Sequence, residues 1–372
     1  MPPDRVYPAL DGLRAVALGA VLISHFFPER SAIQRSFHWG RFGVLLFFVL
    51  SGFLITGLLL RGRDAIDTRG VSRGHVFRAF LIRRALRIAP IYYLVVLIGW
   101  ALSYPPIADL LVFHLTYTGN IALTSFDRPL AQATHLWSLC VEEQFYLLWP
   151  LVVLNATRAS LPLVAGSLVA FSFGFEAWGA LQGRSFEQTH LVLQGCMDAL
   201  GLGALLAILG HAEPRGRAPA RLALGATLVG APLFLFAQGF RYQVGLRATD
   251  RLEYRIPGDI GLALISLALV HFATTSGPSW TRRFLEASPL RYIGKVSYGI
   301  YLYHLFLIPI GRWAARLLDV PELSRGVEMF VVYSLVSLGL AALSWRFIEA
   351  PINNLKRQVP YPPHAVPDDR LG

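Results

Sequence analysis

Hydrophobic residues occur along the chain in runs close to the ~20 residues that a membrane-spanning helix needs. An apolar stretch at 107–124 is interrupted by His114, Tyr117, Thr118 and Asn120, which indicates a re-entrant or surface segment. The pattern predicts an all-α polytopic membrane bundle of about ten helices within residues 1–352. The proline-rich residues 353–372 are expected to be a disordered cytoplasmic tail. The predicted spans are 9–27, 42–60, 85–103, 136–154, 161–180, 190–210, 221–239, 258–275, 290–311 and 327–348.

Composition and charge support a membrane protein. The 372 residues are 54% hydrophobic and 15% charged, with a mean hydropathy of +0.49, which is too apolar for a soluble protein. The net charge of +11 does not indicate nucleic acid, because the arginines lie between the spans, where they mark the cytoplasmic side and meet lipid. Residues 61–88 hold eight arginines, so this connection and both termini are expected in the cytoplasm of a cell-membrane protein.

Two ionisable residues share one face of the first span. Arg14 and His25 are eleven residues apart, which is about 16 Å along a helix and only about 20° past three full turns. Asp11, three residues before Arg14, is placed to pair with it. The first stretch lacks a small-residue cleavage site after His25-Phe26-Phe27-Pro28, so we interpret it as a retained helix rather than a signal peptide.

The fourth span carries a polar stripe at steps of three or four residues. Glu143, next to the stripe, is turned about 100° away and is expected to make a structural ion pair or hydrogen bond. The stripe consists of His135, Ser138, Glu142, Tyr146 and Trp149.

The ninth span repeats this pattern with Ser297, Tyr301 and His304, and Tyr298 lies beside it. Charged and imidazole groups are costly in a bilayer and usually mark function, although each could instead be a hydrogen-bonded interior group. Asp198 is a further lone acid within a span. Three groups suited to proton transfer fall at similar depth: His25, Glu142 and His304.

Arginines gather where the third span enters the bilayer. Arg83, Arg84 and Arg87 present planar forks of donors that match phosphate. They would suit a phosphorylated cytoplasmic ligand. The alternative, which composition leaves equally open, is contact with anionic lipid. The two cysteines, Cys140 and Cys196, both fall inside spans, so no disulfide or thiolate metal site is implied.

Seven stretches together resemble the acyltransferase 3 family of integral membrane acyltransferases. They run in order from residue 9 to 351, and no further domain follows the last span, so the stand-alone membrane form is expected. The stretches are LDGLRAVALGAVLISH, FGVLLFFVLSGFLIT, FLIRRALRIAPIYY, HLWSLCVEEQFYLLWP, MDALGLGALLA, IGKVSYGIYLYH and SWRFIEAP.

The resemblance implies a cytoplasmic acyl-CoA donor, with acetyl-CoA expected, and a hydroxylated acceptor such as a glycan or glycolipid. Arg14 and His25 match the family's Arg-ten residues-His motif, and Arg84 and Arg87 match its Arg-two residues-Arg motif. Its paired glutamates correspond to Glu142 and Glu143. One departure is Cys196, two residues before Asp198, where arginine is expected to be common.

These observations give a mechanistic hypothesis in which His25 is the general base on the acceptor hydroxyl and Glu142 orients its imidazole. Tyr301 or His304 would donate to the thioester oxyanion, and a covalent acyl-histidine relay is a variant. No metal is expected. The alternative function is a transporter or flippase that uses the same intramembrane polar residues, although no inverted repeat is evident in the sequence.

Overall fold

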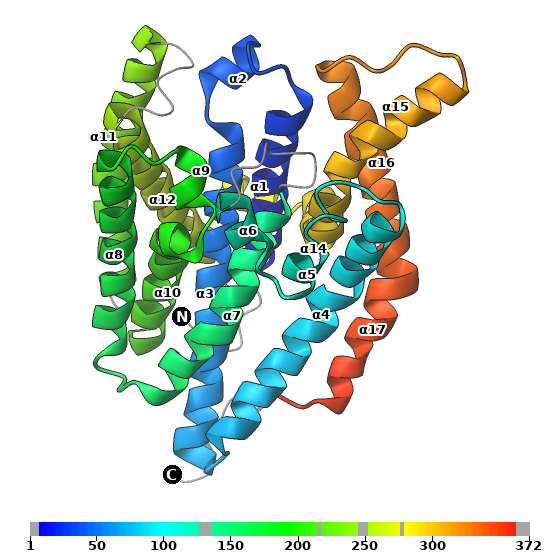
Figure 1. Ribbon diagram of the computed structural model, residues 1–372. Coiled ribbons are helices and arrows are strands. Elements are labelled where there is room, and N and C mark those ends of the chain that lie inside the picture. Colours follow the sequence, from blue (N-terminus) through cyan, green and yellow to red (C-terminus); the bar gives the residue numbers. More distant parts are fainter. Residues whose placement is uncertain (1–6, 126–134, 214–216, 245–251, 276–278, 362–372) are drawn as a thin grey trace.

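The computed structural model of the protein describes residues 7–125, 135–213, 217–244, 252–275 and 279–361 (Figure 1). These residues form helices, and no strand occurs among them. The long helices are α1 (Pro8–Phe26), α3 (Trp39–Arg69), α4 (Arg73–Ala101), α7 (Leu136–Asn155), α8 (Leu161–Leu181), α10 (Met197–Ala212), α11 (Ala218–Val244), α12 (Leu252–Thr274), α14 (Ser288–Tyr303) and α16 (Val327–Ser344). The short ones are α2 (Ala32–Ser36), α5 (Leu111–Leu115), α6 (Gly119–Ser125), α9 (Phe186–His190), α13 (Ser279–Leu285), α15 (Leu307–Leu317), α17 (Ala350–Asn354), the 3₁₀ turns η1 (Leu193–Cys196), η3 (His304–Phe306) and η5 (Leu355–Gln358), and the π turn η4 (Trp345–Glu349).

Every predicted span corresponds to a long helix, so the predicted all-α polytopic bundle is confirmed. Among the described residues, eight helical runs are long and apolar enough to cross a membrane. The counterparts of the predicted third and fourth spans, α4 and α7, are 29 and 20 residues long but do not belong to these eight. The helices begin or end up to several residues away from the predicted limits, because hydropathy marks the apolar centre of a helix better than its ends.

Helix α3 lies in the interior of the bundle, between two groups of helices (Figure 1). On one side are α8, α10, α11 and α12, and on the other are α1, α4, α14 and α16. Close approach to α10 requires glycine: a Cβ on Gly52 would meet the Leu200 carbonyl oxygen, and one on Gly203 would meet the Val49 carbonyl. Small residues in such helix pairs let the backbones pack directly.

The outer helices expose apolar side chains. On α11, Leu224, Leu228, Leu235 and Phe236 are each more than half exposed. A face of this kind is typical of lipid contact, whereas in water it would be a large apolar patch. The buried core therefore lies around α3, and the peripheral helices turn their leucines outward.

The interrupted stretch at 107–124 forms two short helices, α5 and α6, of five and seven residues. Neither is long enough to span a bilayer, so this segment is not an eleventh span. Tyr92 on α4 donates its hydroxyl proton to the His114 carbonyl, and Gln144 on α7 donates to the Tyr117 carbonyl. These bonds attach the segment to neighbouring helices.

The beginning of the tail is helical, which corrects the expectation of disorder for 353–372 in this part. Residues 350–358 form α17 and η5, and Arg83 donates to the Lys356 and Val359 carbonyls at 2.9 and 3.0 Å. The Tyr361 hydroxyl donates to the Leu58 carbonyl. The proline-rich composition indicated disorder because composition does not show tertiary hydrogen bonds such as these. Residues 362–372 lie outside the described residues.

Candidate functional site

Within the part of the chain that the structure describes, two cavities border α1 and α3. The larger, which we call the histidine cavity, has a volume of about 490 Å³. The smaller, the arginine cavity, has a volume of about 100 Å³. The histidine cavity is lined by Val21, Ser24, His25, Glu29, Gln34, His38, Trp39, Gly40, Arg41, Val44, His135, Trp137, Phe186, Glu187, Leu191, Arg241 and Tyr301. The arginine cavity is lined by Arg14, Val44, Phe47, Phe48, Ser51, Arg84, Arg87, Ile88, Ser138, Leu139, Glu142, Tyr146, Ser297, Tyr298 and Tyr301.

Val44 and Tyr301 line both cavities. The Tyr301 hydroxyl donates to the His135 carbonyl at 3.0 Å and lies 2.6 Å from the Ser138 Oγ. Its ring therefore has a fixed place in the wall between the two spaces. Because the hydroxyl proton is already used, Tyr301 is not a free donor for an oxyanion.

Helix α1 connects the two cavities along its length. It is continuous from Pro8 to Phe26, so the sequence distance of eleven residues between Arg14 and His25 becomes a real separation along one face. Arg14 lines the arginine cavity and pairs with Asp11 at 3.0 Å, as expected. His25 lines the histidine cavity. One helix thus presents a cation on one side and an imidazole on the other.

Three imidazoles meet at the edge of the histidine cavity. His25 Nδ1 lies 2.8 Å from His304 Nε2, and the two ring centroids are 4.9 Å apart. The His135 ring centroid is 5.0 Å from that of His304, and its Nε2 donates to the Leu302 carbonyl at 3.1 Å. His304 is completely buried. His25 and His304, which are predicted to lie at similar depth in the membrane, are therefore in direct contact.

Glu142 occupies a different position from the one expected. Glu142 lines the arginine cavity, and its carboxylate accepts a hydrogen bond from the Ser51 Oγ at 2.5 Å. The Ser51 Oγ is also 3.1 Å from the Tyr146 hydroxyl. No hydrogen bond joins Glu142 to His25 within the described residues. The carboxylate therefore does not orient the imidazole directly, because the partner of His25 is another histidine.

The arginines Arg83, Arg84 and Arg87 of the predicted cluster have different surroundings. Arg84 and Arg87 line the arginine cavity together with Arg14. In the described residues no carboxylate forms an ion pair with Arg84 or Arg87, and the Arg84 Nε is buried without a hydrogen-bond partner. Arg83 points elsewhere, since it donates to two carbonyls of the C-terminal segment. Arg83 thus attaches the tail, while the other guanidinium groups face the cavity.

The remaining predicted residues fall into two groups. Ser297 and Tyr298 line the arginine cavity, where their hydroxyls donate to the Gly294 and Ile88 carbonyls at 2.9 Å each. Glu143 and Asp198 line neither cavity. Glu143 Oε1 and both Asp198 carboxylate oxygens are buried without a hydrogen-bond partner among the described residues.

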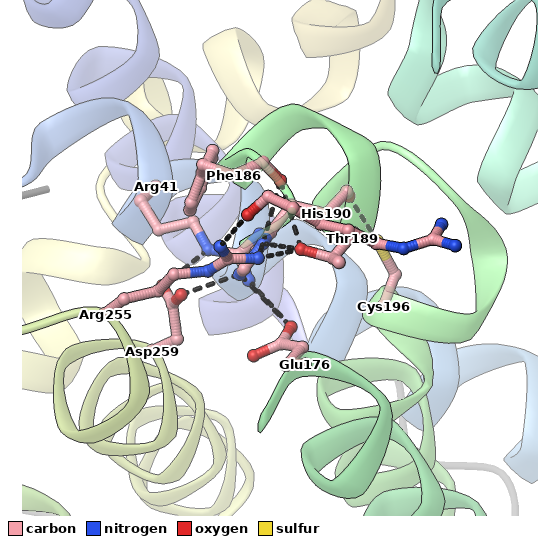
Figure 2. Close-up of polar contacts among 9 residues, drawn as sticks. Arg41, Glu176, Phe186, Thr189, His190, Cys196, Arg255 and Asp259 are labelled. Carbon is pink, nitrogen blue, oxygen red and sulfur yellow. Dashed lines mark hydrogen bonds and ion pairs between the residues drawn. The ribbon is translucent and has the colours of Figure 1, made fainter. Parts of the chain in front are cut away.

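Beside the histidine cavity lies a buried charge network that the sequence did not indicate (Figure 2). Arg41 at the start of α3 donates from Nε to Asp259 of α12 at 2.8 Å, and its terminal nitrogen is 3.7 Å from Glu176 of α8. His190 of α9 lies 2.7 Å from Asp259 and 3.2 Å from Glu176 through its Nε2. Arg255 donates to Thr189. The network joins α3, α8, α9 and α12.

His190 is a neutral member of this network. Burial and the nearby Arg41 guanidinium lower the pKa of His190 to about 4. Its Nε2 donates to the Asp259 carboxylate, which can only accept, and its Nδ1 lies 3.2 Å from the Phe186 carbonyl oxygen and 3.3 Å from a terminal nitrogen of Arg255. Phe186 stacks on the imidazole with centroids 3.9 Å apart and lines the histidine cavity. The network thereby holds one aromatic wall of that cavity.

The three groups Glu176, His190 and Asp259 bring potential metal-ligand atoms within 4.8 Å of one another. Two of them, however, already have partners: His190 donates to Asp259, and Arg41 supplies the positive charge that a cation would otherwise provide, while Glu176 Oε1 has no hydrogen-bond partner among the described residues. Buried carboxylates paired in this way favour a structural ion pair over a metal centre.

A signal for this network was present in the sequence but divided among several elements. Glu176 and Asp259 are single acids in apolar stretches, comparable to Asp198. Arg41 and Arg255 lie at the ends of helices and were counted as loop charges. Arg255 precedes the predicted span 258–275, yet it lies within α12 and is only 2% exposed. Pairing across four helices cannot be derived from spacing along one chain.

Comparisons with known proteins support the family suggested by the motifs. The model of the acyltransferase 3 family, described as an acyltransferase domain, matches residues 7–346. OatA of Listeria monocytogenes, named as a peptidoglycan O-acetyltransferase, is 30% identical over 390 residues, which covers 93% of this chain and 55% of OatA. YrhL of Bacillus subtilis, named provisionally as a peptidoglycan O-acetyltransferase, is 31% identical over 389 residues, covering 94% of this chain and 55% of YrhL.

The chain therefore spans about half the length of these curated relatives. No solved structure gives a significant match. The family match extends from α1 into the π turn after α16, so it includes both cavities and the residues that line them. This multi-pass membrane protein belongs to the acyltransferase 3 family.

Proposed function

We propose that this protein is an O-acyltransferase of the cell membrane that moves an acetyl group from acetyl-CoA to a hydroxyl of a carbohydrate. Both termini and the arginine-rich end of α3 and α4 are placed in the cytoplasm, because that connection holds eight arginines. The arginine cavity then opens toward the donor and the histidine cavity toward the acceptor. The observation that carries the proposal is the meeting of these two cavities at Val44 and Tyr301.

The arginine cavity suits the phosphates of a coenzyme A thioester. Arg14, Arg84 and Arg87 converge on it, and among the described residues Glu142 is the only carboxylate in its lining. Guanidinium groups recognise phosphate with paired donors, and charges held away from bulk water gain most from an opposite partner. Free phosphorylated ligand, rather than lipid alone, is favoured because these side chains face an interior cavity.

The distance between the two functional ends fits an extended donor. Arg14 and His25 are separated by about 16 Å along α1. A phosphate group held near Arg14 would let the pantetheine arm carry its thioester along α1 to the wall formed by Val44 and Tyr301. The acyl carbon would then lie next to the histidine cavity, within reach of an acceptor bound beside His25.

The histidine cavity suits a carbohydrate acceptor. Its volume of about 490 Å³ lies within the range of small-molecule sites. Trp39, Trp137 and Phe186 offer flat apolar faces, and Glu29 and Glu187 offer acceptors for hydroxyl groups. Two relatives named as peptidoglycan O-acetyltransferases further support a hydroxylated carbohydrate.

In the proposed reaction His25 is the general base. It takes the proton of the acceptor hydroxyl as the oxygen attacks the thioester carbon, so that an O–C bond forms and the C–S bond breaks. The proton then passes from His25 to the leaving thiolate. The products are the O-acetylated acceptor and free coenzyme A, and the reaction needs no further reactant.

The test uses membranes that contain equal amounts of wild-type protein, His25→Gln and the control His75→Gln, which removes an exposed histidine from α4. Each is incubated with radiolabelled acetyl-CoA, and label is counted in the glycan and glycolipid fractions. We expect transfer by wild type and His75→Gln and its loss in His25→Gln. Retained transfer in His25→Gln would overturn the base assignment, and the absence of labelled glycan or glycolipid with wild-type membranes would count against acetyl transfer and favour a transporter.

A further inference from the structure

The contact between His25 and His304 determines which nitrogen of each ring carries a proton. A neutral imidazole has one N–H donor and one acceptor nitrogen, and the second partner of the ring selects the tautomer. His304 has such a partner on each side: its Nδ1 lies 2.6 Å from the Tyr301 carbonyl oxygen, and its Nε2 lies 2.8 Å from His25 Nδ1.

The carbonyl of Tyr301 sets the direction of the whole chain of hydrogen bonds. A carbonyl oxygen can only accept, so His304 Nδ1 must carry a proton. The His304 ring is completely buried, and within the described residues no carboxylate is hydrogen bonded to it. Charging it would place an unpaired cation in an apolar interior. Neutral His304 therefore has a bare Nε2, and His25 Nδ1 donates to it.

We infer that His304 is a positioning residue that holds His25 in the tautomer protonated at Nδ1, which leaves His25 Nε2 as the basic nitrogen. In the described residues Nε2 makes no hydrogen bond, and the His25 ring lines the histidine cavity. The backbone also contributes, because the helix changes from α to 3₁₀ at His304, one turn after Tyr301. The tautomer assignment does not depend on the proposed function. The consequence of this tautomer for acyl transfer does rest on the proposed function.

That consequence concerns acyl transfer. When His25 Nε2 accepts the proton of the acceptor hydroxyl, Nδ1 keeps its proton and continues to donate to His304. The resulting imidazolium is stabilised by the His304 lone pair and, beyond it, by the Tyr301 carbonyl. A neutral imidazole thus takes the place that a carboxylate holds in other base dyads, and no net negative charge needs to be buried beside the cavity.

The direct test is solid-state NMR of the full chain in lipid bilayers, with ¹⁵N-labelled histidine at neutral pH. Signals that disappear in His25→Gln identify the two nitrogens of His25. We expect a protonated Nδ1 and an unprotonated Nε2. A His25 protonated at Nε2, or at both nitrogens, would overturn the inference whether or not the protein transfers acetyl groups.

Two substitutions of His304 separate positioning from packing. In His304→Gln the amide oxygen can still accept from His25 and the amide nitrogen can still donate to the Tyr301 carbonyl. In His304→Leu neither bond can form, so both tautomers of His25 should be populated. The control His114→Leu removes another buried histidine, which lines neither cavity.

The same variants provide a kinetic readout. His304→Leu should lower kcat on the order of 100-fold, the size of a general-base contribution, with an unchanged KM for acetyl-CoA. His304→Gln should retain most of kcat and the wild-type tautomer. An equal loss of kcat in both variants with an unaltered His25 spectrum would show a packing role and refute the inference. If the wild type transfers nothing, the proposed function fails while the NMR result still decides the tautomer.

Discussion

Gly43 gives the sharpest test of how the fold sets the site, because it lies where α3 crosses α1. A Cβ added there would be 2.5 Å from the Ala17 carbonyl oxygen and 2.7 Å from a methyl carbon of Val21. An ordinary contact begins near 3.4 Å, so the backbone of α1 would have to retreat by about 0.9 Å. The control is Gly57 on the same helix, where an added Cβ meets nothing within 4 Å.

The two alanine substitutions should have opposite effects on stability. Overpacking costs about 1–3 kcal/mol, whereas replacing an unhindered helical glycine gains up to about 1 kcal/mol. Gly43→Ala should therefore be roughly 2 kcal/mol less stable than Gly57→Ala. The free energy of unfolding can be measured by tryptophan fluorescence during denaturation in mixed micelles.

Activity should follow the same displacement. Val44, beside Gly43, lines both cavities, and α1 carries Arg14 and His25. A shift of about 1 Å between catalytic groups can cost on the order of 100-fold in rate, so kcat of Gly43→Ala should fall well below that of Gly57→Ala. Equal stability and equal kcat of the two variants would refute the proposed contact between α1 and α3.

Three further predictions concern the walls of the site. Replacing Arg84 and Arg87 with glutamine should raise the KM for acetyl-CoA at least tenfold, because each lost charge-assisted bond is worth about 1.5–3 kcal/mol. The KM for the acceptor should not change. Equal changes in both KM values would indicate a structural role for the two arginines. Asp259→Asn should lower the free energy of unfolding by about 3–5 kcal/mol, because it removes the nearer carboxylate partner of the buried Arg41 guanidinium, which denaturation of the purified protein would detect. Ser51→Ala removes the hydrogen bond to the Glu142 carboxylate and should lower the free energy of unfolding by about 1–3 kcal/mol, because a buried acceptor loses its donor; an unchanged free energy of unfolding would refute the importance of this bond.

The architecture could be predicted from the sequence where a periodic signal lies within one helix. The apolar runs gave the long helices, and eleven residues between Arg14 and His25 placed them on one face of α1. The stripe of α7 also holds, since Ser138, Glu142 and Tyr146 all line the arginine cavity. Periodicity works here because a helix repeats every 3.6 residues regardless of its neighbours.

The partners of these residues could not be predicted in the same way. His25 was assigned to Glu142 because both lie at similar depth, but depth does not specify direction across the bundle. The preference for His304 depends on a 3₁₀ turn that presents its ring toward α1. Similarly, Gly57 shares the small size of Gly43 but meets open space. Tertiary packing, rather than local pattern, decides which of several equivalent positions makes contact.

The shared wall at Val44 and Tyr301 also bears on the permeability of the membrane. An enzyme that accepts one substrate from each side of a bilayer must not become a channel for ions. Here one valine and one tyrosine ring stand between the two spaces, and the Tyr301 hydroxyl is fixed by its bond to the His135 carbonyl. Under the proposed function, catalysis and electrical insulation therefore place opposite demands on the same two side chains: the wall would have to be thin enough for an acyl group to cross and tight enough to stop a hydrated ion.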